Sequence, residues 1–375
     1  MQGYEFRYGP QLISGAGAAR RLAELLPEGR CLFVTDANVR GLGLADAVLA
    51  ALPDTIVFDA VEEDPSRETL MAAVAAGEGC TSVVGFGGGS PMDVAKLAAY
   101  LIATGEDLDT LWGVGKATGT KLPLALVPTT AGTGSEATAV TVITVGGSEK
   151  RGVNSPALYA NWAVLDAELT LTLPRHVTAA TGIDAMVHAI EAYTSARRKN
   201  PMSDMFARKA LRLISDNLLI ACDRPDDLEA RGKMLTAAHL AGIAFDNAPV
   251  AGVHALAYPL GGHFHVPHGL SNALMLTHVL GHNMEAARPL YAELGAMLDP
   301  SVHDIGQQGQ AQAFVQHLAR LSRAAGVPQR LGAVGVGPEH LDLLASEAMK
   351  QARLLINNPC PITQEDARRL YEAAL

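Results

Sequence analysis

The chain has 375 residues, of which 49% are hydrophobic and 18% are charged, and this balance excludes a largely disordered protein. The length exceeds the size at which a single hydrophobic core usually keeps growing, so we expect two domains. The net charge of −10 argues against a nucleic-acid-binding protein, because phosphate binding depends on clustered lysine and arginine.

The first half of the chain alternates short apolar runs with helical patterns. Strands are expected at residues 31–35, 55–58, 82–86 and 122–127, and helices at residues 44–52, 69–79 and 91–104. Strands that alternate with helices predict parallel βαβ units. The strand runs are continuously apolar, as expected when helices cover both faces of a sheet. We therefore predict an α/β domain with a parallel sheet over residues 1–176.

Asp36 follows the first well-formed strand. Dinucleotide-binding folds place a carboxylate there, where it accepts hydrogen bonds from the adenosine ribose and repels a 2′-phosphate. This position favours NAD over NADP. An alternative interpretation is that Asp36 only caps the helix that begins near Val39.

A glycine-rich loop links the third predicted strand to the next helix. Gly87, Gly88 and Gly89 carry no side chains, so a pyrophosphate could approach backbone N–H groups at the positive end of that helix. Ser90 and Asp93 predict a capping-box-like start of the helix. The loop does not have the GxGxxG spacing, and an ordinary tight turn is the alternative.

A hydroxyl-rich loop, residues 128–136, follows the strand at residues 122–127. It carries four hydroxyl groups and two glycines at a strand end, where ligands of open α/β sheets bind. Ligand contact is the favoured interpretation, and a solvent-facing polar loop is the alternative.

The second half of the chain shows long helical patterns and no convincing strand. Helices are expected at residues 177–193, 204–217, 227–244, around His254, and at 289–298, 311–325, 338–352 and 363–374. We predict an all-helical second domain over residues 177–375.

Four residues of this second domain are candidate metal ligands. Asp184 and His188 have i, i+4 spacing on one face of the helix at residues 177–193, among apolar neighbours where unpaired polar groups are costly. His254 and His268 add two imidazoles from a segment punctuated by glycine and proline. One carboxylate and three imidazoles suit Fe(II) and Zn(II) alike. Histidines hydrogen-bonded within a core are the alternative.

Five motifs together resemble the iron-containing (group III) alcohol dehydrogenase family, in that family's order and spacing. They are residues 86–93, 128–136, 182–193, 254–269 and 357–359. The resemblance implies a Rossmann-like N-terminal dinucleotide-binding domain and a helical C-terminal domain. It also implies that the four candidate ligands bind Fe(II), with Zn(II) as a replacement, and that the cofactor is a nicotinamide dinucleotide, for which Asp36 favours NAD.

Further site residues follow from the same resemblance. The implied cofactor contacts are Gly88, Gly89 and Ser90 of the glycine loop, Thr129, Thr130 and Thr133 of the hydroxyl-rich loop, and Lys150. Asp36, from its place at a strand end, and Asp93, beside the glycine loop, complete the predicted cofactor-binding residues. The implied substrate pocket is lined by Val140, Phe245 and Leu354. These three side chains are apolar, which favours a small aliphatic alcohol or aldehyde. The implied reaction is hydride transfer between nicotinamide and a substrate held at the metal.

Tyr258 departs from the family pattern, because many members have histidine at this position. A phenol, with a usual pKa of about 10, is a poorer base than imidazole at neutral pH. Tyr258 either joins a proton relay, with His254 as the other candidate catalytic residue, or packs beside the nicotinamide. The same tyrosine is similar to that of hydroxyacid–oxoacid transhydrogenases, which keep NAD bound. A transhydrogenase is therefore the alternative function, and it would need both acids for turnover.

We also expect a cytoplasmic protein. The first twenty residues lack the apolar core of a signal peptide, and no apolar run is long enough to cross a membrane. The four cysteines form no CxxC pair, which fits a reducing compartment. The family resemblance implies a homodimer or a larger homo-oligomer.

Overall fold

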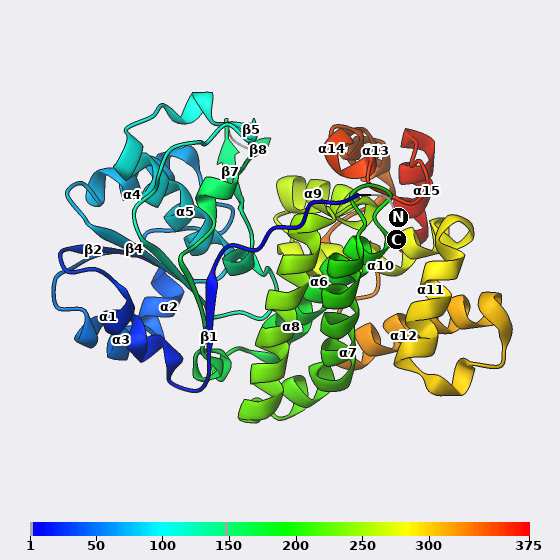
Figure 1. The fold of residues 1–375 in the computed structure, drawn as a ribbon. Coiled ribbons are helices and arrows are strands. Elements are labelled where there is room, and N and C mark those ends of the chain that lie inside the picture. Colours follow the sequence, from blue (N-terminus) through cyan, green and yellow to red (C-terminus); the bar gives the residue numbers. More distant parts are fainter. Residues whose placement is uncertain (1–2, 147–148) are drawn as a thin grey trace. The chain divides into compact units, whose positions relative to one another are not determined.

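The computed structural model describes residues 3–146 and 149–375, which divide into two compact units (Figure 1). The α/β unit is Tyr8–Thr172, and the helical unit is Leu173–Leu375 together with the residues that precede Tyr8. None of the helices in residues 3–146 and 149–375 combines the length and apolarity needed to cross a bilayer.

A six-stranded sheet with only parallel pairings forms the centre of the α/β unit, as predicted. Its strands, in spatial order, are β1 (Gln11–Ser14), β9 (Trp162–Leu165), β6 (Leu124–Pro128), β4 (Ser82–Gly87), β2 (Cys31–Val34) and β3 (Thr55–Phe58). The first strand of the βαβ series, β2, has β3 on one side and β4, the strand that follows β3 along the chain, on the other. The strand order therefore reverses between β2 and β4. Ligands of open α/β sheets bind at the carboxyl ends of strands beside such a reversal.

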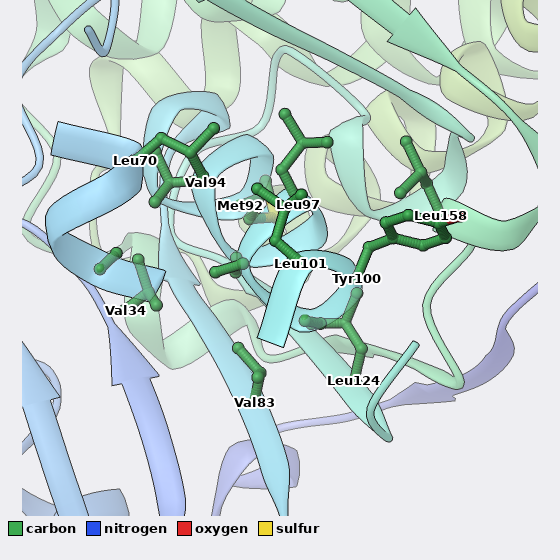
Figure 2. Close-up of a cluster of buried hydrophobic side chains, with 14 of the residues drawn as sticks. Val34, Leu70, Val83, Met92, Val94, Leu97, Tyr100, Leu101, Leu124 and Leu158 are labelled. Carbon is green, nitrogen blue, oxygen red and sulfur yellow. The ribbon is translucent and has the colours of Figure 1, made fainter. Parts of the chain in front are cut away.

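Helices cover both faces of this sheet, which explains the continuously apolar strands. They are α1 (Leu22–Leu25), α2 (Ala37–Gly41), α3 (Asp46–Ala51), α4 (Arg67–Ala76) and α5 (Gly89–Thr104). Successive side chains of β2 alternate between two cores: Cys31 and Phe33 lie in one, and Leu32 and Val34 in the other. Figure 2 shows the second core, where side chains of α5 such as Leu97 gather with side chains of the strands.

The helix α5 begins at Gly89, two residues earlier than predicted, and its start corrects the predicted capping box. Its N-cap residue is Gly88, and no side chain caps it. Ser90 lies inside the first turn, and Asp93 makes its hydrogen bonds elsewhere in the unit. The helix ends as expected at Gly105, whose φ of 64° is the left-handed conformation that glycine adopts at little cost.

A second, three-stranded sheet was not predicted. It consists of β5 (Gly113–Val114), β8 (Glu149–Asn154) and β7 (Val140–Val145), with β7 and β8 antiparallel. Short 3₁₀ turns complete the unit: η1 (Ala18–Arg21), η2 (Leu108–Thr110), η3 (Ser135–Ala137), η4 (Pro156–Leu158) and η5 (Ala167–Thr170).

The rest of the chain is helical, as predicted. Its helices are α6 (Arg175–Thr194), α7 (Pro201–Asp223), α8 (Leu228–Asn247), α9 (Gly252–Phe264), α10 (His268–His282), α11 (Met284–Leu298), α12 (Gly306–Ala325), α13 (Leu341–Met349), α14 (Ala352–Leu355) and α15 (Gln364–Ala374). Three 3₁₀ turns join them: η6 (Pro300–Val302), η7 (Leu331–Val334) and η8 (Pro338–His340). The sequence did not predict α10, and the helix expected at residues 338–352 is η8, α13 and the start of α14.

Helices α6, α7 and α8 pack against one another and run side by side (Figure 1). Local sequence sets where they begin: the Asn200 side chain accepts hydrogen bonds from the first turn of α7, and Asp227 caps α8 in the same way. Gly182 lets α6 pack closely, because a Cβ there would lie 2.5 Å from the Leu218 side chain. This bundle holds the middle of α6, which carries two of the candidate metal ligands.

Candidate functional site

The four candidate metal ligands lie together in the helical unit. Asp184 and His188 are on consecutive turns of α6, His254 is in the first turn of α9, and His268 is the first residue of α10. Their ligand atoms all lie within 4.8 Å of one another. Asp184 Oδ1 is 3.6 Å from His268 Nε2 and 4.0 Å from His254 Nε2. We call these four residues the metal cluster.

Close packing of α10 on α6 brings His268 to the cluster. A Cβ at Gly269 would lie 2.6 Å from the Ala180 carbonyl oxygen and 3.3 Å from Cβ of Asp184. Only glycine permits this approach of the two helices, because the first of these contacts is with backbone that cannot move aside easily.

Ring packing holds the imidazoles in place. The His188 ring stacks on Phe245, with ring centres 4.4 Å apart, and on His254 at 4.8 Å. The His254 and His268 rings are 5.3 Å apart. Asp184, His188 and His254 are buried, and His268 is partly exposed.

Electrostatics favour the protonation states that a metal ligand needs. Burial on its own raises the pKa of Asp184, but the nearby imidazoles and a hydrogen bond from Asn272 lower that pKa below its ordinary value. Burial, followed by the neighbouring imidazoles, lowers the pKa of His254 well below its ordinary value. The cluster therefore presents a carboxylate and a neutral imidazole at neutral pH, which are the forms that coordinate a cation.

These residues fit a divalent metal. His254 Nε2 is buried in the cluster and has no hydrogen-bond partner among the described residues, a situation that costs about 1–3 kcal/mol unless something binds there. Three imidazoles and one carboxylate are a donor set typical of Fe(II) and Zn(II) sites.

Two residues that hydrogen-bond to the candidate ligands were not predicted from the sequence. Glu191 Oε2 is hydrogen-bonded to His254 Nδ1 at 2.7 Å, and the Asn272 amide N–H donates to Asp184 Oδ1 at 2.6 Å. A periodicity signal was present: Glu191 is two helical turns beyond Asp184, and Asn272 is one turn beyond His268. That spacing puts each on the same helix face as a ligand, but it does not say which ring nitrogen each contacts.

The predicted substrate residues fall in both units. Phe245 packs on His188, and the Tyr258 ring lies 5.8 Å from the His268 ring in the same helical unit. Leu354 is buried in α14, which packs against α9. Val140 belongs to the α/β unit, where its carbonyl accepts a hydrogen bond from the buried Lys96.

The two predicted cofactor loops lie against each other in the α/β unit. A Cβ at Gly88 would come within 3.8 Å of the Thr130 hydroxyl, and a Cβ at Gly89 within 3.0 Å of the Thr133 methyl. Thr129 donates its backbone N–H to the Gly87 carbonyl. The loops therefore form one surface at the carboxyl ends of β4 and β6.

Asp36 joins this surface from the end of β2. One oxygen, Oδ1, accepts a hydrogen bond from the Val39 N–H at 2.9 Å, which confirms that Asp36 caps α2. The other, Oδ2, lies 3.2 Å from where a Cβ of Gly87 would be. Capping and a contact with a ligand at the glycine loop are therefore compatible, because they use different oxygens.

Asp93 and Lys150 have protein partners of their own. Asp93 accepts hydrogen bonds from the Ser135 hydroxyl at 2.6 Å and the Val142 N–H at 2.8 Å, so it braces the hydroxyl-rich loop from inside. Lys150 donates to Asp64 Oδ1 at 2.6 Å. The carboxylate of Asp93 thus supports the surface that the two loops form, and the cofactor contacts expected for Asp93 and Lys150 stay predictions.

Two family models together span nearly the whole chain. Residues 9–167 match "Iron-containing alcohol dehydrogenase", and residues 178–375 match "Fe-containing alcohol dehydrogenase family, C-terminal". Both matches fall on the order and spacing of motifs from which the sequence predicted this family.

Curated relatives and solved structures agree. The chain is 40% identical over 368 residues to long-chain-alcohol dehydrogenase 1 of Geobacillus thermodenitrificans, covering 94% of this chain and 93% of the relative. It is 31% identical to NAD-dependent methanol dehydrogenase of Bacillus methanolicus, covering 98% of each. A crystal structure of 1,3-propanediol oxidoreductase superposes with a TM-score of 0.96 at 32% identity, covering all of both chains. These names do not favour the transhydrogenase alternative. The chain belongs to the iron-containing alcohol dehydrogenase family.

Proposed function

We propose that this protein is a metal- and NAD-dependent alcohol dehydrogenase that interconverts small aliphatic alcohols and aldehydes. The metal cluster is the observation that carries the proposal, because it gathers one carboxylate and three imidazoles within 4.8 Å beside an apolar ring, that of Phe245. Family membership supports the same reaction class.

The proposed metal is Fe(II), with Zn(II) as a replacement that the same ligands accept. The proposed cofactor is NAD, bound at the surface formed by Asp36, the glycine loop and the hydroxyl-rich loop. A solved relative, sulfoacetaldehyde reductase from Bifidobacterium kashiwanohense, was determined in complex with NAD+ and superposes with a TM-score of 0.88 at 27% identity, covering 100% of this chain and 99% of its own.

The chain's own residues bind and orient the reactants. In such a site the cation stabilises negative charge on an alcohol oxygen or polarises a carbonyl, and the nicotinamide accepts or supplies hydride. Asp184 contributes the only anionic ligand of the cluster, and the three imidazoles are neutral, so a divalent cation with these four ligands would carry a net charge of about +1. Phe245 and Leu354 would select an apolar substrate chain, and Tyr258 would receive or supply the hydroxyl proton.

The proposal also includes a cytoplasmic homodimer or larger homo-oligomer. All four cysteines are free, as suits a reducing compartment. Light scattering on the purified protein would measure the oligomeric state directly.

Metal removal tests the proposed reaction. Protein stripped with EDTA should lose its NADH-dependent reduction of butanal, because the carbonyl is no longer polarised. Activity should return when Fe(II) is added anaerobically, or Zn(II) in air. The readout is NADH absorbance, and full activity in protein shown to be metal-free would reject the mechanism.

A further inference from the structure

Glu191 is buried on α6 and faces the start of α9. Its Oε2 accepts a hydrogen bond from the Ala251 N–H at 2.8 Å and is hydrogen-bonded to His254 Nδ1 at 2.7 Å. Its Oε1 accepts one from the Val253 N–H at 2.6 Å. Two backbone N–H groups and one ring nitrogen from the start of α9 therefore converge on a single carboxyl group.

The contact with His254 fixes which ring nitrogen carries the proton. Burial raises the pKa of Glu191 to about 7, and hydrogen bonds from the Ala251 and Val253 N–H groups to its two oxygens oppose that rise by stabilising the carboxylate. A carboxylate can only accept hydrogen bonds, so in this form the proton of the neutral imidazole is on Nδ1. The lone pair is then on Nε2, which lies 4.0 Å from Asp184 Oδ1 and has no hydrogen-bond partner among the described residues. The contact of Glu191 with Nδ1 thus leaves Nε2, on the opposite side of the ring, available to bind a metal.

The two backbone contacts fix where the ring points. The N–H groups of Ala251 and Val253 hold the carboxylate in one orientation at the positively polarised start of α9. His254 is the next residue along the chain, so its ring has to meet a carboxylate that is already anchored. The contact therefore holds the His254 ring against α6, with Nδ1 2.7 Å from Oε2.

We propose that Glu191 is a positioning residue that fixes the tautomer and orientation of His254 and thereby raises the affinity of the cluster for a divalent metal. The proposal rests on the proposed function, since it needs the cluster to bind metal. Partners of metal-bound histidines typically contribute 10–100-fold to metal affinity.

The test compares Zn(II) and Co(II) dissociation constants of metal-free wild type and Glu191→Gln, measured by chelator competition. A carboxamide has one acceptor oxygen in place of two and turns an N–H toward one of the three donors. We expect about 10–100-fold weaker binding. The matched control is Asp166→Asn in the α/β unit, where a buried carboxylate accepts three backbone N–H groups, from Gly17, Ala19 and Glu168, and contacts no ligand. The control should bind metal like the wild type.

A double-mutant cycle separates positioning from general support of the fold. In a His254→Ala background, Glu191→Gln should weaken metal binding no further. An equal loss in both backgrounds, or unchanged affinity in the single variant, overturns the proposal while leaving the proposed function intact. A wild type that binds neither metal rejects the proposed function itself.

Nitrogen NMR of metal-free wild-type protein gives a readout that needs no folded Glu191 variant. With 15N-labelled histidine, the His254 ring should show a protonated Nδ1 and a bare Nε2, and the signal is assigned by its loss in His254→Gln. A proton on Nε2 overturns the proposal.

Discussion

At the residue scale, the two carboxylate oxygens of Asp36 make different contacts. Oδ1 caps α2, and Oδ2 lies beside Gly87 at the end of β4. Both β2 and β4 flank the reversal of strand order, where a dinucleotide ribose would be held. A negative charge at this point would disfavour the 2′-phosphate of a bound NADP.

Replacing Asp36 with glycine should therefore relax the preference for NAD. We expect the NAD/NADP ratio of kcat/KM to fall about tenfold or more, since tenfold corresponds to about 1.4 kcal/mol of repulsion removed. Asp227→Gly is the matched control, because Asp227 caps α8 through the Ala230 N–H in the same way. The assigned role is wrong if the ratio changes equally in both variants or in neither.

Tyr258 allows a second test at this scale. Its ring lies 5.8 Å from that of the ligand His268, and its hydroxyl is the group that distinguishes it from phenylalanine. If the phenol passes the substrate proton, Tyr258→Phe should lower kcat about 100-fold, and Tyr258→His should restore most of it. Stopped-flow or steady-state kcat measures this, and a wild-type kcat in the phenylalanine variant would assign Tyr258 to packing alone.

The ligand types of the metal cluster could be predicted from sequence, but their supports could not. The i, i+4 spacing of Asp184 and His188 indicates that both lie on one helix face, and His254 and His268 complete the ligand set. Glu191 and Asn272 act through hydrogen bonds across helix boundaries, to His254 Nδ1 and Asp184 Oδ1. Those contacts depend on how closely α9 and α10 pack on α6, which no local pattern states.

At the element scale, Asp93 ties α5 to two other parts of the α/β unit. It accepts hydrogen bonds from Ser135 in η3 and Val142 in β7, and it lies 3.5 Å from the fully buried Lys96 ammonium. The hydroxyl-rich loop runs into η3. Asp93 of α5, the helix that begins at the glycine loop, therefore holds this loop in place.

Asp93→Ala should destabilise the protein by about 2–4 kcal/mol, because it leaves two partly buried donors without their acceptor and removes a carboxylate beside a buried ammonium. The measurement is the shift in denaturant midpoint of metal-free protein. Asp54→Ala is the control: Asp54 pairs with Arg30 at the surface, where an ion pair contributes about 1 kcal/mol or less. Equal shifts in the two variants would contradict the bracing role of Asp93.

The elements that sequence failed to predict are those whose stability comes from neighbours. β8 reads Glu149-Lys-Arg-Gly-Val-Asn154, a charged segment with a glycine and little intrinsic strand preference, and it forms because it pairs with β7 along its whole length. β1 and β9 are four residues each and pair with one another. The parallel strands β2, β4 and β6, by contrast, are buried on both faces and could be predicted from their continuous apolar runs.

At the scale of the whole molecule, the metal cluster and the predicted cofactor-binding residues lie in different units. The metal cluster and its supports, Glu191 and Asn272, belong to the helical unit, whereas Asp36 and both cofactor loops belong to the α/β unit. The sequence predicted two such parts because its pattern changes from alternating strands and helices to helices only. The packing of α10 on α6, by contrast, became visible only in three dimensions.

This division predicts separable stabilisation by metal and by NAD. A ligand that binds only the folded state stabilises it by RT ln(1 + [L]/Kd), about 2.7 kcal/mol at one hundred times Kd. Asp184→Asn should abolish the rise in melting temperature caused by Zn(II) and keep the rise caused by NAD. Gly88→Ala should do the reverse, since its new methyl would sit 3.8 Å from Thr130, a contact the fold tolerates, on the surface a pyrophosphate must approach.

Differential scanning fluorimetry on the four combinations of variant and ligand makes the measurement. Loss of both shifts in Asp184→Asn would mean that NAD needs the metal cluster in order to bind, and loss of both in Gly88→Ala would mean the converse. Either result contradicts separable sites. Retention of one shift in each variant is the expected outcome, because each ligand then draws its stabilising contacts from residues of one unit.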